Sequence, residues 1–310
     1  MKISARNILA GKTTAIKKGR CARSCFPASP HAIKMKPRHI VIAGLAAFLA
    51  ASASATGLTV FAAASLSDSL KEIAPVYAKA TGDTVRFNFG ASGTLARQIK
   101  EGAPADVFVS ADELRVDQLE KAGLLLPGTR KTILANQLVV IVAAANGAPV
   151  ASLADLKKVD VRRIAIGEPA TVPVGTYTKE HLEKLGLWTQ VSGKCVPLDN
   201  VRAVLAAVES GNADVGFVYK TDALSVPANP PDAIGRARPP GAPRPADGQA
   251  ISTKVRIATL VPLAEGPRIT YPVAVMRDTK APEAAKAFAV FLAGPDAQKV
   301  FAKFGFLPPN

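Results

Sequence analysis

Short apolar segments alternate with segments of helical periodicity from about residue 58 to the C-terminus. Leu58–Ala63 and Leu138–Ala143 have the length and composition of buried strands. Apolar side chains recur at the spacing of one helix face in residues 66–77, and again in residues 201–208, where Asp199 is suited to cap the helix. This alternation predicts an α/β fold with mostly parallel sheets flanked by helices. The length of 310 residues predicts about two domains.

The first 55 residues differ from the rest of the chain in charge. They hold ten of the 39 Lys and Arg residues and none of the 24 Asp and Glu residues, so most of the net charge of +15 belongs to them. No basic segment interleaved with aromatic residues follows, and we expect no nucleic-acid partner. Ile40–Ala51 is an apolar run too short to span a bilayer comfortably, and Ala53–Ala55 has the small residues of a cleavage site.

Residues 1–55 are therefore predicted to be an N-terminal extension and signal peptide, cleaved after Ala55, that directs the protein to the periplasm. Met35 is an alternative start, and a buried core helix is the alternative interpretation of the apolar run. Only Cys195 and His181 remain of the cysteines and histidines after such cleavage. This leaves no internal disulfide, and it argues against a histidine-rich metal site and a Ser-His-Asp triad. We expect Cys195 to be a small buried hydrophobic residue.

Several positions lie where a predicted strand passes into a predicted helix. Ser65, Ser92, Val174 and Val201 all fall at such junctions. Helix N-termini offer unpaired N–H groups and the positive end of a dipole, so several of them directed at one point bind an anion without Lys or Arg. Each position alone has an ordinary explanation, because serine is a common N-cap and Tyr219 also fits a plain strand aromatic. Spacing alone does not show that the five positions converge.

The resemblance to a known family depends on several motifs in combination. These are Phe61–Leu66 (FAAASL), Gly90–Ile99 (GASGTLARQI), Gly102–Asp112 (GAPADVFVSAD), Gly167–Pro169 (GEP), Val172–Gly175 (VPVG), Asp199–Arg202 (DNVR), Ala213–Tyr219 (ADVGFVY), Tyr271–Ala274 (YPVA) and Lys303–Phe306 (KFGF). Together they resemble the periplasmic molybdate-binding proteins of molybdate ABC transporters, over about residues 58–306.

The resemblance implies a two-lobed type II periplasmic-binding-protein fold with the ligand in the cleft between the lobes. Lobe 1 is expected to comprise residues 56–135 and 271–310, and lobe 2 residues 136–270. A proline-rich insertion at residues 227–248 is longer than the family pattern leads us to expect. We predict that it is an exposed loop with no part in binding, with a partner-binding role as the alternative.

The resemblance also implies the groups that hold the ligand. Ser65 and Ser92 match serines that use both hydroxyl and N–H, Val174 and Val201 match N–H donors, and Tyr219 matches a phenol that completes the shell. Val174 stands where the family often has alanine, a mild change because only the backbone acts there. Molybdenum is thus held as an oxyanion, without direct metal ligands, catalytic residues or a cofactor. The expected partner is the inner-membrane permease of the importer, and we expect a monomer.

The chemistry of the ligand agrees with this set of donors. Molybdate is fully deprotonated at neutral pH and only accepts hydrogen bonds, whereas phosphate still carries a proton that requires an acceptor. Tungstate, with nearly the same size and charge, is expected to bind comparably. Sulfate or thiosulfate is the closest alternative ligand, because only cavity size excludes a second deprotonated oxyanion.

Other classes of protein fit the sequence less well. The matched positions offer neither the Arg and Asp of an amino-acid binder nor the tyrosine pair of a ferric-ion binder. A serine hydrolase with Ser65 or Ser92 as nucleophile lacks a base close by in the pattern. The effector domain of a transcription regulator is a further alternative, which the export signal and the lack of a helix-turn-helix argue against. The sequence therefore predicts a solute-binding protein and not an enzyme.

Overall fold

The computed structural model describes residues 56–224 and 254–309, which fall in one compact unit of the chain, residues 52–310. The predicted signal peptide (residues 1–55) and the proline-rich insertion (residues 227–248) lie outside the described residues. No helix in the described ranges is both long enough and apolar enough to cross a bilayer.

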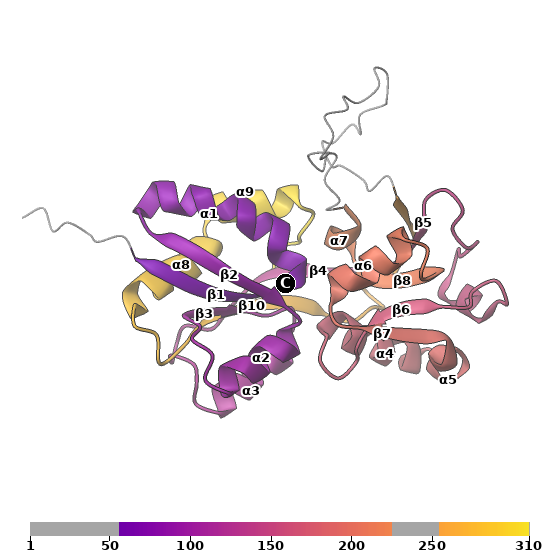
Figure 1. Ribbon diagram of the computed structural model, residues 1–310, viewed down its shortest axis with the longest axis horizontal. Helices are drawn as coiled ribbons and strands as arrows, with labels where there is room; N and C mark the ends of the chain where they lie inside the picture. Colours follow the sequence, from indigo (N-terminus) through magenta and orange to yellow (C-terminus); the bar gives the residue numbers. More distant parts are fainter. Residues whose placement is uncertain (1–55, 225–253, 310) are drawn as a thin grey trace, which may run out of the picture. The chain divides into compact units, whose positions relative to one another are not determined.

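The described residues form strands and helices that alternate along the chain (Figure 1). The strands are β1 (Gly57–Ala63), β2 (Thr84–Gly90), β3 (Val107–Val109), β4 (Lys131–Asn136), β5 (Leu138–Ala143), β6 (Ile164–Gly167), β7 (Cys195–Leu198), β8 (Val215–Tyr219), β9 (Val255–Leu260) and β10 (Ile269–Val275). The α-helices are α1 (Ser67–Thr81), α2 (Ser92–Lys100), α3 (Glu113–Lys121), α4 (Pro173–Lys184), α5 (Trp188–Val191), α6 (Val201–Glu209), α7 (Lys220–Leu224), α8 (Pro282–Leu292) and α9 (Pro295–Lys303). The 3₁₀ turns are η1 (Ala64–Leu66), η2 (Leu153–Lys157) and η3 (Ser192–Lys194).

The strands form two sheets with the same topology. The order is β2-β1-β3-β10-β4 in the first sheet and β7-β6-β8-β5-β9 in the second. In each sheet only the fourth strand, β10 or β5, runs antiparallel to its neighbours, so the other four strands point the same way. The predicted α/β class with mostly parallel sheets is confirmed.

Helices cover both faces of each sheet. In the first sheet α1, α8 and α9 lie on one face and α2 and α3 on the other, and in the second sheet α6 and α7 lie opposite α4 and α5 (Figure 1). The alternation of side chains along β1 serves both faces, because Val60 belongs to the core beneath α1 whereas Phe61 packs with Leu95 of α2. Each face therefore holds its helices through burial of apolar side chains.

The chain passes between the two sheets twice. It leaves the first sheet at Asn136, the last residue of β4, and enters the second at Leu138, so that Gln137 alone separates the two strands. The carbonyl oxygen of Gln137 accepts from the N–H of Lys220, the first residue of α7, at 2.8 Å. The chain returns to the first sheet through residues 261–268, between β9 and β10. The lobe boundaries predicted from the sequence stay a prediction.

Two local predictions are wrong. The N-cap of α6 is Asn200, whose side-chain oxygen accepts from the N–H groups of Arg202 and Ala203, and not Asp199. Cys195 is a free cysteine that is only partly buried, because it lies on β7, an edge strand of the second sheet. Its thiol contacts the carbonyl oxygen of Val191 at 3.4 Å.

Gly216 of β8 lets α6 lie close to the second sheet. A Cβ atom at Gly216 would lie 2.7 Å from Cγ2 of Val208 and 3.1 Å from Cγ1 of Val204, both on α6. Gly216→Ala should therefore push α6 away from the sheet and lower the free energy of unfolding by about 1–3 kcal/mol, measured by urea denaturation. Gly193→Ala is the control, because its Cβ would meet open space. Equal stability of the two variants would contradict this account of the packing.

Candidate functional site

The five positions identified in the sequence surround one small cavity, to which both sheets contribute. Its lining is Ala63, Ala64, Ser65, Gly90, Ala91, Ser92, Ala111, Val172, Pro173, Val174, Asn200, Val201 and Tyr219. None of these described lining residues carries a charge. The cavity has a volume of about 10 Å³, which is close to the minimum for one enclosed water molecule. A pocket of this size has no room for an amino acid or a sugar in this structure.

Each of the five positions lies at, or shortly after, the carboxyl end of a parallel strand. Ser65 lies in η1 after β1, and Ser92 is the first residue of α2 after β2. Val174 is the second residue of α4, and Val201 is the first residue of α6. Tyr219 ends β8. The carboxyl ends of parallel strands meet at one edge of a sheet, which explains how residues so far apart in the sequence reach the same cavity.

The backbone N–H groups of four of these residues have no partner. The first residues of a helix have no acceptor within the helix. In residues 56–224 and 254–309 the N–H groups of Ser65, Ser92, Val174 and Val201 donate to no protein acceptor. No side chain caps α2 or α4, whereas Asn200 caps α6 through the next two N–H groups and leaves that of Val201 unused. The cavity thus collects N–H donors and the positive ends of helix dipoles.

The hydroxyl of Ser92 is positioned by the backbone. Its oxygen accepts from the N–H of Ala111 at 3.0 Å, and Ser92 is fully buried. Because a backbone N–H only donates, the hydrogen of the Ser92 hydroxyl remains available for another acceptor.

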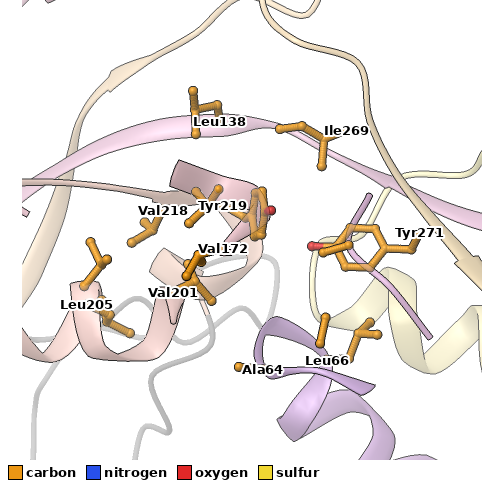
Figure 2. Close-up of a cluster of buried hydrophobic side chains, with 14 of the residues drawn as sticks. Ala64, Leu66, Leu138, Val172, Val201, Leu205, Val218, Tyr219, Ile269 and Tyr271 are labelled. Carbon is orange, nitrogen blue, oxygen red and sulfur yellow. The ribbon is translucent and has the colours of Figure 1, made fainter. Parts of the chain in front are cut away.

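The hydroxyl of Tyr219 is buried and unpaired. The residue is 1% exposed, and its oxygen has no hydrogen-bond partner among the described residues. Burial raises the pKa of Tyr219 well above its ordinary value, so the phenol keeps its proton. Buried polar groups without a partner are rare in folded proteins, and this one lies beside a cavity from which a ligand or water can accept its hydrogen. Figure 2 shows this hydroxyl pointing toward that of Tyr271, which belongs to the first sheet.

Segments that follow strands of the two sheets are in direct contact beside the cavity. The N–H of Gly93 on α2 donates to the carbonyl oxygen of Thr171, which precedes α4, at 3.0 Å. A Cβ atom at Gly93 would lie 2.4 Å from that oxygen, so only glycine fits this approach. Close by, Nη2 of Arg115 on α3 donates to the carbonyl oxygen of Ala170 at 2.6 Å.

A second contact between elements of the two sheets is an ion-pair network. Arg202 of α6 contacts Asp68 of α1 at 2.8 Å and Asp222 of α7 at 2.9 Å. Asp222 is fully buried, and burial raises its pKa to about 6 although Arg202 lowers it. Arg202 lies within the Asp199–Arg202 motif, but nothing in the sequence indicates its partners.

The contacts of the two serines bear on the hydrolase alternative. The oxygen of Ser65 lies 3.1 Å from the hydroxyl of Tyr271, and that of Ser92 contacts the Ala111 N–H. Neither serine in the described part of the chain is hydrogen-bonded to a histidine, a lysine or a carboxylate, which a nucleophilic serine requires. Within the same residues, no group of three or more His, Cys, Asp or Glu side chains is placed to hold a metal ion.

Comparisons with known proteins find one family across nearly all of the described chain. The model of the bacterial extracellular solute-binding protein family matches residues 58–307. The molybdate-binding protein ModA of Escherichia coli (strain K12) is 36% identical over 259 residues, which are 80% of this chain and 88% of that protein. A putative ABC transporter substrate-binding lipoprotein of Bacillus subtilis (strain 168), YvgL, is also 36% identical, over 87% of this chain and 98% of its own length.

This chain is also similar to a solved structure of a molybdate-binding protein. The periplasmic molybdate-binding protein of Azotobacter vinelandii superposes with a TM-score of 0.68 at 26% identity, over 82% of this chain and all of that chain. The likeness confirms the predicted periplasmic-binding-protein fold.

Asp222 should make the stability of the protein depend on pH. Its pKa of about 6 in the folded protein exceeds the ordinary value of 3.8. Between these two pH values the carboxyl group is protonated in the folded state and ionised in the unfolded chain. The stability that Asp222 contributes is therefore greatest below about pH 4 and is lost as the pH rises through about 6. Relative to Asp222→Asn, the wild-type protein should lose roughly 1–3 kcal/mol of unfolding free energy between about pH 4 and 7.

Urea denaturation across this pH range measures the difference. Asp296→Asn, at an exposed carboxylate on α9, is the control and should follow the wild-type pH dependence. Parallel profiles for the wild type and Asp222→Asn would contradict the raised pKa.

Proposed function

Since this chain belongs to the bacterial extracellular solute-binding protein family, we propose that it captures molybdate for an ABC importer and holds the ion in the cavity formed by Ser65, Ser92, Val174, Val201 and Tyr219. The observation that carries the proposal is the buried Tyr219 hydroxyl, which has no partner among the described residues. A buried unpaired donor costs about 1–3 kcal/mol, and an oxyanion in the cavity removes that cost.

The available groups are donors throughout. Four unpaired N–H groups and the hydrogens of Ser92 and Tyr219 face a ligand, and none of the described lining residues is a carboxylate. Molybdate has only acceptor oxygens, so it pairs with every donor and requires no acceptor in return. Hydrogen phosphate carries a proton that requires a hydrogen-bond acceptor, and this lining has no carboxylate to accept it.

Helix dipoles take the place of ionic partners. α2, α4 and α6 all begin at the cavity, and negative charge is favoured at each helix N-terminus. A lining without Lys or Arg also avoids the desolvation cost of a buried ion pair. The small cavity adds selection by size, which favours compact oxyanions over organic anions.

The proposed ligand and the proposed role in transport are taken from the relatives. The Escherichia coli and Azotobacter vinelandii proteins are named for molybdate, and we extend that ligand to this chain together with tungstate, which has similar size and charge. The two lobes close over the ion by a hinge at the crossovers near Gln137 and residues 261–268, and the closed form binds the inner-membrane permease. Removal of residues 1–55 releases the protein as a monomer into the periplasm. The protein acts by binding and not by catalysis.

Isothermal titration calorimetry with molybdate, tungstate, sulfate and phosphate near pH 7 tests the proposal. Molybdate and tungstate should bind tightly and with similar affinity, and sulfate and phosphate much more weakly. Tyr219→Phe should weaken molybdate binding by about 1–3 kcal/mol, or roughly 5- to 150-fold in Kd, because it removes one donor from the shell.

Tyr77→Phe is the matched control, since Tyr77 is equally buried but packs against Phe288 of α8, away from the cavity lining. Its molybdate affinity should equal that of the wild type. Tighter binding of sulfate than of molybdate would assign the site to the rival ligand. If Tyr219→Phe bound molybdate as tightly as the wild type, the assignment of the Tyr219 hydroxyl as a ligand-binding group would be wrong.

A further inference from the structure

The side chain of Asn136 has a fixed orientation. Its Oδ1 atom lies 2.8 Å from the backbone nitrogen of Gln137. Because a backbone N–H only donates, the atom that faces it must be the amide oxygen, and the NH₂ group must lie on the other side. Asn136 is 2% exposed, so water does not offer an alternative arrangement.

This orientation sets the direction of the next hydrogen bonds. Nδ2 of Asn136 lies 3.1 Å from the hydroxyl oxygen of Tyr271 and 2.9 Å from Oγ1 of Thr221. An amide NH₂ group only donates, so the oxygen of Tyr271 is an acceptor in this contact. Burial raises the pKa of Tyr271 well above its ordinary value, so the phenol keeps its hydrogen and can donate it.

The hydrogen of Tyr271 is directed to Ser65. The two hydroxyl oxygens are 3.1 Å apart and both residues are buried. Tyr271 accepts from Asn136 and has one hydrogen of its own, for which the Ser65 oxygen is the only acceptor within reach among the described residues. A buried hydrogen without an acceptor is costly, so Tyr271 donates to Ser65, and Ser65 retains its own hydrogen for the cavity. The opposite direction would use the Ser65 hydrogen on Tyr271 and present only lone pairs to a ligand. The Ser92 hydroxyl likewise accepts a hydrogen bond, from the N–H of Ala111. Both serine hydroxyls therefore accept from a protein donor and keep their own hydrogen for a ligand.

We propose that Asn136 and Tyr271 are positioning residues that fix the hydroxyl of Ser65 as a hydrogen-bond donor and thereby favour fully deprotonated oxyanions over those that carry a proton. The inference rests on the proposed function and deepens it. Neither residue lines the cavity, so both act through Ser65. Asn136 ends β4 at the crossover and also contacts Thr221 of α7, so the relay spans elements of both sheets.

The test is a double-mutant cycle on molybdate affinity, measured by calorimetry. Tyr271→Phe keeps the ring, which packs edge-on against Phe306 at 5.4 Å, and removes only the hydroxyl. We expect it to raise the Kd for molybdate about 2- to 10-fold. In a Ser65→Ala background the same change should have no further effect, because the group through which it acts is gone. In a Ser92→Ala background it should keep its full effect.

A second measurement separates positioning from general damage to the fold. Without Tyr271, the Ser65 oxygen is free to accept as well as to donate, so the preference for molybdate over phosphate near pH 7 should fall in Tyr271→Phe. Tyr77→Phe removes an equally buried hydroxyl outside the cavity and should leave both affinity and preference unchanged. Asn136→Ala is a second variant that reaches the same serine, and its effect should likewise vanish in Ser65→Ala.

Each outcome is decisive for one of the two proposals. Wild-type affinity in Tyr271→Phe, or an equal effect of this change in the Ser65→Ala and Ser92→Ala backgrounds, would overturn the relay and leave the proposed function intact. A wild-type protein that binds neither molybdate nor tungstate would overturn the proposed function and the relay with it.

Discussion

Unpaired donors buried at one point are the constraint on which the arrangement of this protein depends. Helices that begin beside a cavity leave their first N–H groups without partners, and Tyr219 adds a phenol that has none among the described residues. Buried donors are costly unless an acceptor meets them, and this cost is the basis on which we propose an acceptor-rich ligand for the cavity. The rest of the fold brings these donors together and keeps other acceptors away.

The repeated topology of the two sheets achieves this convergence. In each sheet four strands point the same way, and the loops at their carboxyl ends carry the cavity residues. The first sheet supplies Ser65 and Ser92, and the second supplies Val174, Val201 and Tyr219. Close approach of the two sets requires Gly93, where a side chain would collide with the Thr171 carbonyl. The backbone geometry therefore defines the site as much as any side chain does.

Sequence patterns predicted central strands and the site positions more readily than edge strands and supporting contacts. β4, β7 and β9 are edge strands, and they lack the continuous apolar run by which β1 and β5 were predicted. The five site positions came from motifs that the resemblance gave a role. Tyr271 lies in such a motif too, but its role depends on which atom of Asn136 faces the Gln137 N–H, and only three-dimensional contacts contain that information.

Charges and helix dipoles have separate roles near the cavity, so the proposed anion site lies beside an arginine that does not line it. Arg202 follows Val201 on α6, yet its guanidinium contacts Asp68 on α1 and Asp222 on α7. The cation thus joins elements of the two sheets and is neutralised there, while the N–H groups and hydroxyls remain available for the proposed ligand. An arginine in the cavity would attract any anion, protonated or not. A shell of neutral donors in fixed directions discriminates instead by the hydrogens that the ligand carries, and this is why the direction of the bond between Tyr271 and Ser65 matters for the proposed selectivity.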